Sequence, residues 1–205
     1  MSQEIDKVIQ RTQRYYYEDG LVETAVGLLF FIIGLALLGW LTIQSNPTLG
    51  IVMVLVSVLL IFGGTLFVQK TIPYLKERLT HPRTGKVVYK QNEPPRSRWF
   101  IGLPILVVLF LALFLPERFQ QIALMEGALL GFVLVYLGYR VNLRRFYIMG
   151  TAALLMGLAG ANWFNNEITS SAFTFGSIGL IMLVSGLIML TQYLRRHPIV
   201  EADYE

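Results

Sequence analysis

Six long apolar segments dominate this chain of 205 residues, and the charged residues gather in short clusters between them. A helix rises 1.5 Å per residue, so about 20 apolar residues cross the hydrocarbon core of a membrane. Continuous apolar runs predict spanning helices, whereas a membrane β-barrel needs short alternating segments. We therefore expect an all-α, polytopic membrane bundle of six transmembrane helices, in residues 21–43, 48–72, 99–115, 119–139, 146–164 and 172–194.

The composition agrees with a membrane protein. Only 15% of the residues are charged, whereas soluble domains carry about 25%, and the mean hydropathy is +0.58. The chain has no cysteine, which excludes disulfides, thiol catalysis and cysteine metal sites. The net charge of +4 is explained by lysines and arginines gathered on one predicted side of the membrane, so we expect no nucleic-acid partner. The first apolar segment is too long for a signal-peptide core, and we expect no cleavage.

The basic residues set the orientation. Sixteen of the 17 lysines and arginines lie on one side of a six-span topology, and Arg118 is the exception. An excess of lysine and arginine in short loops marks the cytoplasmic side. The chain should therefore form three hairpins that turn tightly on the outer side of a bacterial plasma membrane, with both termini cytoplasmic. We divide it into an interfacial helix (residues 1–20), a transmembrane domain (21–194) with a cytoplasmic loop (73–98), and a cytoplasmic tail (195–205).

Small residues recur seven positions apart in five of the segments. Two turns of helix place such residues on one stripe, where small side chains let helix backbones approach closely. The pattern predicts packing along these stripes and is compatible with three related hairpins. The third segment is bulky throughout, so we expect it to face lipid or a partner. The stripes are Gly27/Gly34, Gly50/Ser57/Gly64, Gly131/Gly138, Gly150/Gly157 and Gly179/Gly186.

Glu126 lies inside the fourth segment, roughly 10 Å from its start. Charged groups within a membrane usually face the bundle interior, pair or become protonated. This position predicts either a proton- or cation-linked pocket that opens outward or a structural hydrogen bond between helices. The possible neighbours, chosen by depth or by reach from the rim, are Ser57, Asn162, Thr174, Ser177 and Arg118.

Other polar positions have simpler interpretations. Glu23 stands in the first turn of the first segment, where a carboxylate interacts favourably with the helix dipole by about 0.3–1 kcal/mol. In the predicted topology Glu23 and Glu126 lie at opposite membrane faces and cannot pair. Residues 165–171 are expected to form a polar turn, residues 140–145 a basic link, and Arg195 and Arg196 are expected to stop the last helix.

The loop at residues 73–98 is the longest polar stretch between the apolar segments. Residues 74–80 should continue the second helix, and Pro82 should end it. A turn at residues 82–85 and a short strand at 86–89 are expected to follow. The loop either sets the topology alone or offers a docking surface to a protein partner or anionic lipid. The candidate docking residues are Arg83, Lys86, Val87, Val88, Tyr89 and Lys90.

Two short motifs resemble segments of uncharacterised bacterial multi-pass membrane proteins. The first is YEDGLVE, from Tyr17 to Glu23, and the second is RLTHPRTG, from Arg78 to Gly85, followed by a Val-Val-Tyr triplet. The resemblance implies a bacterial membrane protein and carries no activity.

The sequence contains no recognisable catalytic constellation. Its two histidines, His81 and His197, lie far apart and outside the apolar segments, so we expect no metal site, haem or other cofactor. The leading hypothesis is a non-enzymatic accessory protein that docks a partner through its basic loop. The alternative is a small transporter or channel with an outward-facing site around Glu126, and a lipid-modifying enzyme is a third hypothesis. Membrane lipids are expected partners, and a homo-oligomer is compatible with the sequence.

Overall fold

The computed structural model describes residues 14, 16–43, 63–64, 66–80 and 122–198. Its four long helices are α2 (Leu21–Ile43), α6 (Ile122–Val141), α7 (Arg144–Trp163) and α8 (Glu167–Arg196). Residues 66–79 form a further helix, called here the 66–79 helix. Helix is the only regular secondary structure in this described part of the chain, in agreement with the all-α prediction.

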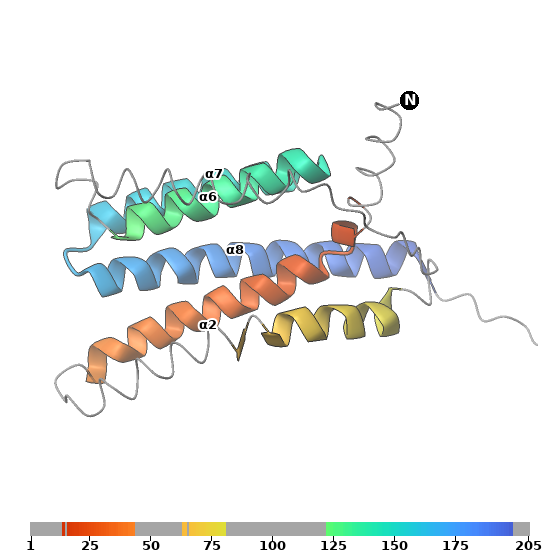
Figure 1. The fold of residues 1–205 in the computed structure, drawn as a ribbon, viewed down its shortest axis with the longest axis horizontal. Coiled ribbons are helices and arrows are strands. Elements are labelled where there is room, and N and C mark those ends of the chain that lie inside the picture. The colour runs from red at the N-terminus through yellow and green to blue at the C-terminus, as the bar shows by residue number, and fades with distance from the viewer. Residues whose placement is uncertain (1–13, 15, 44–62, 65, 81–121, 199–205) are drawn as a thin grey trace, which may run out of the picture.

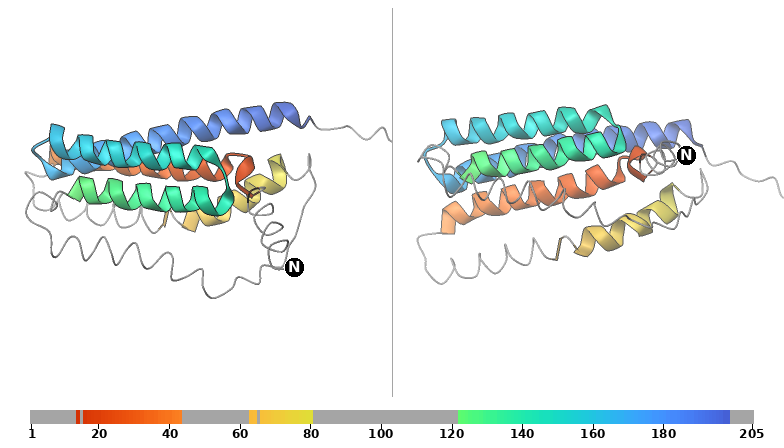
Figure 2. Two further views of the ribbon diagram at one scale, coloured as in Figure 1. Left: turned by 90° about the horizontal axis from the view of Figure 1, so that it is seen from above. Right: turned by 45° about the horizontal axis from the view of Figure 1, so that its top comes forward.

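Helix α8 contacts each of the other three long helices, and the bundle is shown from three directions in Figures 1 and 2. Helix α8 packs against α2 on one side and against α7 and α6 on the other, and the 66–79 helix lies beside α2. The bundle has two distinct ends. The arginine end, where α6 joins α7, carries Arg140, Arg144, Arg145, Arg195 and Arg196. The asparagine end, where α7 joins α8, carries Asn162, Asn165 and Asn166.

Glycines bring α2 and α8 into backbone contact. A Cβ atom at Gly34 would lie 2.6 Å from the Gly176 nitrogen, and one at Gly27 would lie 2.9 Å from the Gly179 carbonyl oxygen. A Cβ atom at Gly186 would lie 2.9 Å from the Gly20 carbonyl oxygen. No side chain fits at such distances, so this seam of antiparallel helices depends on glycine.

A second glycine seam joins α6 to α7. A Cβ atom at Gly127 would lie 2.6 Å from the Gly157 Cα, and one at Gly131 would lie 2.8 Å from the Gly150 carbonyl oxygen. Gly138 continues the seam against the Phe146 side chain. The predicted packing along the glycine stripes is thus confirmed for the four long helices. In the second segment, Gly64 faces a leucine of α2, and the other two positions of that stripe lie outside the described residues.

The distribution of apolar side chains suits a lipid environment. Leu35, Ile148 and Leu155 are each more than half exposed, whereas Ala153 and Thr174 are completely buried. A water-soluble fold would expose far less contiguous apolar surface. All four long helices are long and apolar enough to cross a membrane, so this is a membrane protein. Its small core joins α6, α7 and α8 through Leu134, Phe146, Met149, Ala153, Ile178 and Met182.

The first long helix has the predicted bounds, but α8 begins earlier than expected. It starts at Glu167, so the predicted polar turn at residues 165–171 is wrong after Asn166. Asn166 explains this start, because its side-chain oxygen accepts hydrogen bonds from the Ile168 and Thr169 N–H groups at 2.9 and 3.3 Å. The cap compensates N–H groups that would otherwise lack partners, and the polar residues after it can be helical.

The basic link and the end of the last helix are also corrected. The link predicted at residues 140–145 shrinks to Asn142 and Leu143, since α6 and α7 extend into the arginines on both sides. Asn142 makes this tight connection with a left-handed φ of 55°, which asparagine tolerates. Arg195 and Arg196 form the last turn of α8 rather than a stop before it. Basic side chains in the last turn interact favourably with the helix dipole.

The remaining predictions about the fold are settled only where the described residues reach them. The expected continuation of the second segment through residues 74–79 is confirmed by the 66–79 helix. Most of the interfacial helix, most of the second segment, the third segment, the turn at 82–85 and the strand at 86–89 lie outside the described residues.

Candidate functional site

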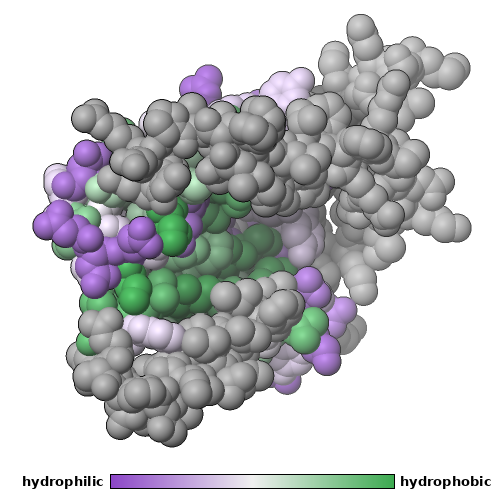
Figure 3. All heavy atoms as spheres, turned by 60° about the vertical axis from the view of Figure 1, so that its left-hand side comes forward, coloured by the Kyte–Doolittle hydropathy of each residue, from purple (hydrophilic) through white to green (hydrophobic). Residues whose placement is uncertain are grey.

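Glu126 lines a cavity between α2, α6 and α8 near the asparagine end. The cavity has a volume of about 460 Å³, and the Glu126 side chain is half-buried. Figure 3, turned so that the asparagine end comes forward, shows a recess with a hydrophobic floor beside hydrophilic residues. The lining is mostly apolar, with three polar side chains, and comprises Phe30, Ile33, Ala36, Leu37, Ile122, Glu126, Glu167, Ile168, Ser171 and Phe175.

Among the described residues, no basic side chain stands opposite the Glu126 carboxyl group in this cavity. Ser171 of α8 is within hydrogen-bonding reach of that group, but the Glu126 Oε2 atom is buried without a hydrogen-bond partner among those residues. Glu167, one turn before Ser171, adds a second carboxyl group that is exposed. No basic side chain lines the cavity among the described residues. A buried carboxyl group in this situation is suited to take up a proton or a cation.

Two aromatic rings complete the cavity wall. Phe30 of α2 and Phe175 of α8 pack edge to face, with ring centroids 5.8 Å apart and an interplanar angle of 68°. The face of an aromatic ring attracts cations and its edge does not. A cation that reaches the face of either ring would therefore be attracted to this wall.

Of the five residues predicted to surround Glu126, the three in the described part of the chain do not line this cavity. Asn162 is exposed on α7, and its amide donates to the Leu158 carbonyl oxygen at 2.7 Å. The Ser177 hydroxyl donates to the Phe173 carbonyl oxygen at 2.6 Å within α8. Thr174 is buried and likewise bonded within its own helix, to the Ser170 carbonyl oxygen. Ser57 and Arg118 lie outside the described residues.

The polar residues that do face Glu126 were missed because of the wrong helix start. Glu167, Ser171 and Phe175 are spaced four apart, so they share one face of α8. That spacing is visible in the sequence, but it has meaning only if the helix begins before Ser171. An asparagine followed by an acidic residue is a helix-start signal that would have revealed this face.

A second group of charged side chains is buried at the arginine end. The Lys76 Nζ and Asp19 Oδ2 atoms are 2.8 Å apart, with side chains only 7% and 4% exposed. Lys76 also donates to the Tyr16 carbonyl oxygen and lies 4.0 Å from the centre of the Tyr16 ring. Burial lowers the pKa of Lys76, and the Asp19 carboxylate opposes this shift. The pair fastens the 66–79 helix to the segment before α2.

Glu23 forms the second ion pair of this group, with Arg145 at the start of α7. Arg145 Nε lies 2.8 Å from Glu23 Oε1, and the Glu23 side chain is 1% exposed. The two atoms are at ion-pair distance without the alignment of a hydrogen bond. Arg145 also donates to the Tyr17 carbonyl oxygen. Besides interacting with the helix dipole, as predicted, Glu23 therefore links α2 to α7, a role that the sequence analysis missed.

The Asp19-Gly20 dipeptide fixes the start of α2 beside these two pairs. Asp19 Oδ1 accepts a hydrogen bond from the Leu21 N–H at 3.1 Å, which caps the start of α2. Gly20 has a φ of 73°, and a Cβ atom there would lie 2.6 Å from the Gly186 carbonyl oxygen. Only glycine satisfies both conditions. We call Asp19, Glu23, Lys76 and Arg145 the ion-pair cluster.

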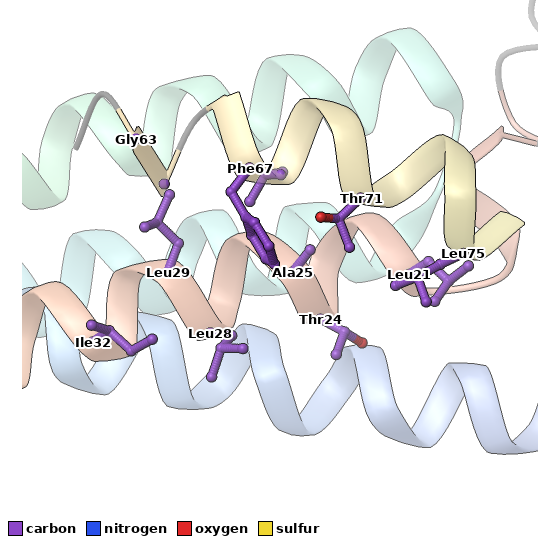
Figure 4. A pocket seen from close by; sticks show the side chains of 12 residues that line it. Leu21, Thr24, Ala25, Leu28, Leu29, Ile32, Gly63, Phe67, Thr71 and Leu75 are labelled. Carbon is purple, nitrogen blue, oxygen red and sulfur yellow. The ribbon is translucent and has the colours of Figure 1, made fainter. Parts of the chain in front are cut away.

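A larger cavity of about 550 Å³ lies between α2 and the 66–79 helix (Figure 4). Its wall is apolar except for the hydroxyl groups of Thr24 and Thr71, and no charged residue lines it among those described. It therefore offers no group for acid–base chemistry. The predicted docking residues Arg83, Lys86, Val87, Val88, Tyr89 and Lys90 lie outside the described residues.

Comparison with known proteins adds no functional assignment. The chain matches no protein-family model, no curated protein and no solved structure.

Proposed function

We propose that this chain is a multi-pass protein of a bacterial plasma membrane, with six spans in three hairpins and both termini in the cytoplasm. The charge distribution supports this topology, because the arginines of α6, α7 and α8 gather at one end of the bundle. By the positive-inside rule, that arginine end faces the cytoplasm. The asparagine end and the Glu126 cavity then face outward.

The function that the geometry supports best is that of a small transporter, with Glu126 as its proton- or cation-binding group. The observation that carries this proposal is the buried Glu126 Oε2 atom, which has neither a hydrogen-bond partner nor a basic side chain beside it among the described residues, in a cavity of about 460 Å³. A carboxyl group placed there costs stability, because a charge inside a membrane is expensive. Groups that are retained at such a cost commonly serve a function.

At this site a proton and a cation would compete for one carboxyl group, that of Glu126. Glu126 can hold a proton or stand opposite a cation, and binding of one displaces the other. The Ser171 hydroxyl lies within hydrogen-bonding reach of this carboxyl group and can donate to its charged form. At the arginine end, the ion-pair cluster and the seam between Gly20 and Gly186 close the bundle. We assign this state of the protein to an outward-facing step.

Proton flux into proteoliposomes tests the proposed function. Full-length protein is reconstituted with a pH-sensitive dye inside the vesicles, and a membrane potential is imposed. We expect flux above that of protein-free vesicles, and Glu126→Gln should reduce it to that background. Glu18→Gln removes an exposed carboxyl group at the other end of the bundle and should leave the flux unchanged. Equal flux through the wild type and Glu126→Gln would exclude the transporter.

A second candidate function is that of an accessory protein that docks a partner through the basic loop at residues 73–98. Its support is the concentration of positive charge there, including the docking residues Arg83, Lys86 and Lys90. A cytoplasmic basic patch binds acidic partners or anionic lipid. Deletion of residues 86–91 should remove proteins that co-purify with the full-length chain. An unchanged set of co-purifying proteins would rule this function out.

A further inference from the structure

The Glu126 cavity combines three properties that together select a class of ligand. It lies inside an apolar bundle, it presents two carboxyl groups and it has an aromatic wall. We propose that its ligand is a lipophilic organic cation. This inference rests on the proposed function only in taking the Glu126 cavity as the binding site.

Charge complementarity predicts the sign of the ligand's charge. Glu126 and Glu167 both line the cavity, and no basic side chain lines it among the described residues. Glu126 supplies a half-buried carboxyl group, and Glu167 adds an exposed one. An anion would face both carboxyl groups without compensation, which is unfavourable in a poorly solvated site. A cation instead supplies the partner that Glu126 Oε2 lacks.

The apolar wall gives the character of the ligand. A small hydrated cation would have to lose water in exchange for few oxygen ligands, since Glu126, Glu167 and Ser171 are the only polar side chains lining the cavity among the described residues. An organic cation instead buries its hydrocarbon against the apolar wall. It can also gain a cation–π contact with Phe30 or Phe175.

Binding of a matched pair of ions tests this inference. Tetraphenylphosphonium and tetraphenylborate have the same shape and opposite charge, and both are permanently charged. Each is dialysed to equilibrium against the full-length protein in detergent micelles, with protein-free micelles as the blank. We expect saturable binding of the phosphonium and none of the borate. Equal binding of both ions would show a merely hydrophobic surface and would overturn the inference.

Three variants locate the bound cation. Glu126→Gln should weaken tetraphenylphosphonium binding by at least about tenfold, because the buried charge is lost. Phe175→Leu should weaken it by about two- to fivefold. Glu18→Gln, which removes an exposed carboxyl group at the opposite end, should leave the affinity unchanged. An affinity that does not depend on Glu126 would overturn the inference.

The two proposals fail in distinguishable ways. If Glu126→Gln stops proton flux but tetraphenylphosphonium does not bind the wild type, the inference is wrong and the proposed transporter stands. If tetraphenylphosphonium binding requires Glu126 but proton flux does not, the inference holds and the transport function is wrong.

Discussion

The two ends of this bundle each bury carboxyl groups, but they treat them differently. At the arginine end, Asp19 stands opposite Lys76 and Glu23 stands opposite Arg145, each pair at 2.8 Å. At the asparagine end, Glu126 faces a cavity, a serine and a second carboxyl group, without a basic partner among the described residues. Charges that the fold compensates serve its stability. A charge that the fold leaves uncompensated beside a cavity is the better candidate for function.

The two ends also differ in whether their charged side chains link separate parts of the fold. Each ion pair of the cluster joins elements distant in sequence: the segment before α2 to the 66–79 helix, and α2 to α7. Among the described residues, Glu126 joins nothing of opposite charge. Removing a charge should therefore weaken the protein at the arginine end and leave it intact at the asparagine end. For each variant below, the measured quantity is the free energy of unfolding in mixed micelles.

The largest loss is expected from Arg145→Met. Glu23, which is 1% exposed, would remain as a buried charge without a partner, and breaking a buried pair in this way costs about 3–5 kcal/mol. Arg144→Met is the matched control, because Arg144 is the preceding residue and its exposed side chain should tolerate the change. The double variant Glu23→Gln/Arg145→Met should regain part of the loss. A stable Arg145→Met protein would mean that the cluster has no structural role.

A smaller loss is expected from Lys76→Met. Asp19 would lose its cation but keep the hydrogen bond from the Leu21 N–H, so the cost should be about 1.5–3 kcal/mol, the range for a hydrogen bond to a charged group. Lys70→Met, in the same helix but exposed, provides the control. If both lysine variants lose the same amount, the burial of Lys76 is irrelevant to stability.

The glycine seam that holds α2 on α8 connects the two ends, and it can be tested with one methyl group. Gly179→Ala places a Cβ atom 2.8 Å from the Phe30 carbonyl carbon, so the helices must separate and we expect a loss of about 1–2 kcal/mol. Gly176→Ala, three residues away in the same helix, places its Cβ atom in open space. That variant should be as stable as the wild type or slightly more so. Equal losses would contradict the seam.

For the four long helices that the structure describes, the sequence predicted the apolar segments and the glycine packing well and the polar contacts poorly. Long apolar runs and glycine spacing depend on periodicity within one helix, so the bounds of α2 and the seams of α6, α7 and α8 follow from local pattern. The ion pairs depend on which helix ends meet. Asp19, Glu23, Lys76 and Arg145 all carry charge on the predicted cytoplasmic side, but local pattern does not determine their pairing.

The candidate site was half predicted for the same reason. Glu126 stood out because a carboxyl group inside an apolar run is costly wherever the helix packs. The neighbours of Glu126 depend on how the helices pack and on the start of α8 at Glu167. That start was not predicted, because residues 165–171 are polar and were assigned to a turn. Depth alone suggested Asn162 and Ser177, whose hydrogen bonds stay within their own helices.

We infer that Glu126 serves function at the expense of stability, whereas the ion-pair cluster serves stability. The most direct test is the free energy of unfolding of Glu126→Gln, measured beside Arg145→Met in the same micelles. Glutamine keeps the volume and removes the uncompensated charge, so we predict a stability within about 1 kcal/mol of the wild type, or above it. A loss as large as that of Arg145→Met would show that Glu126 is a structural residue and would contradict its proposed functional role.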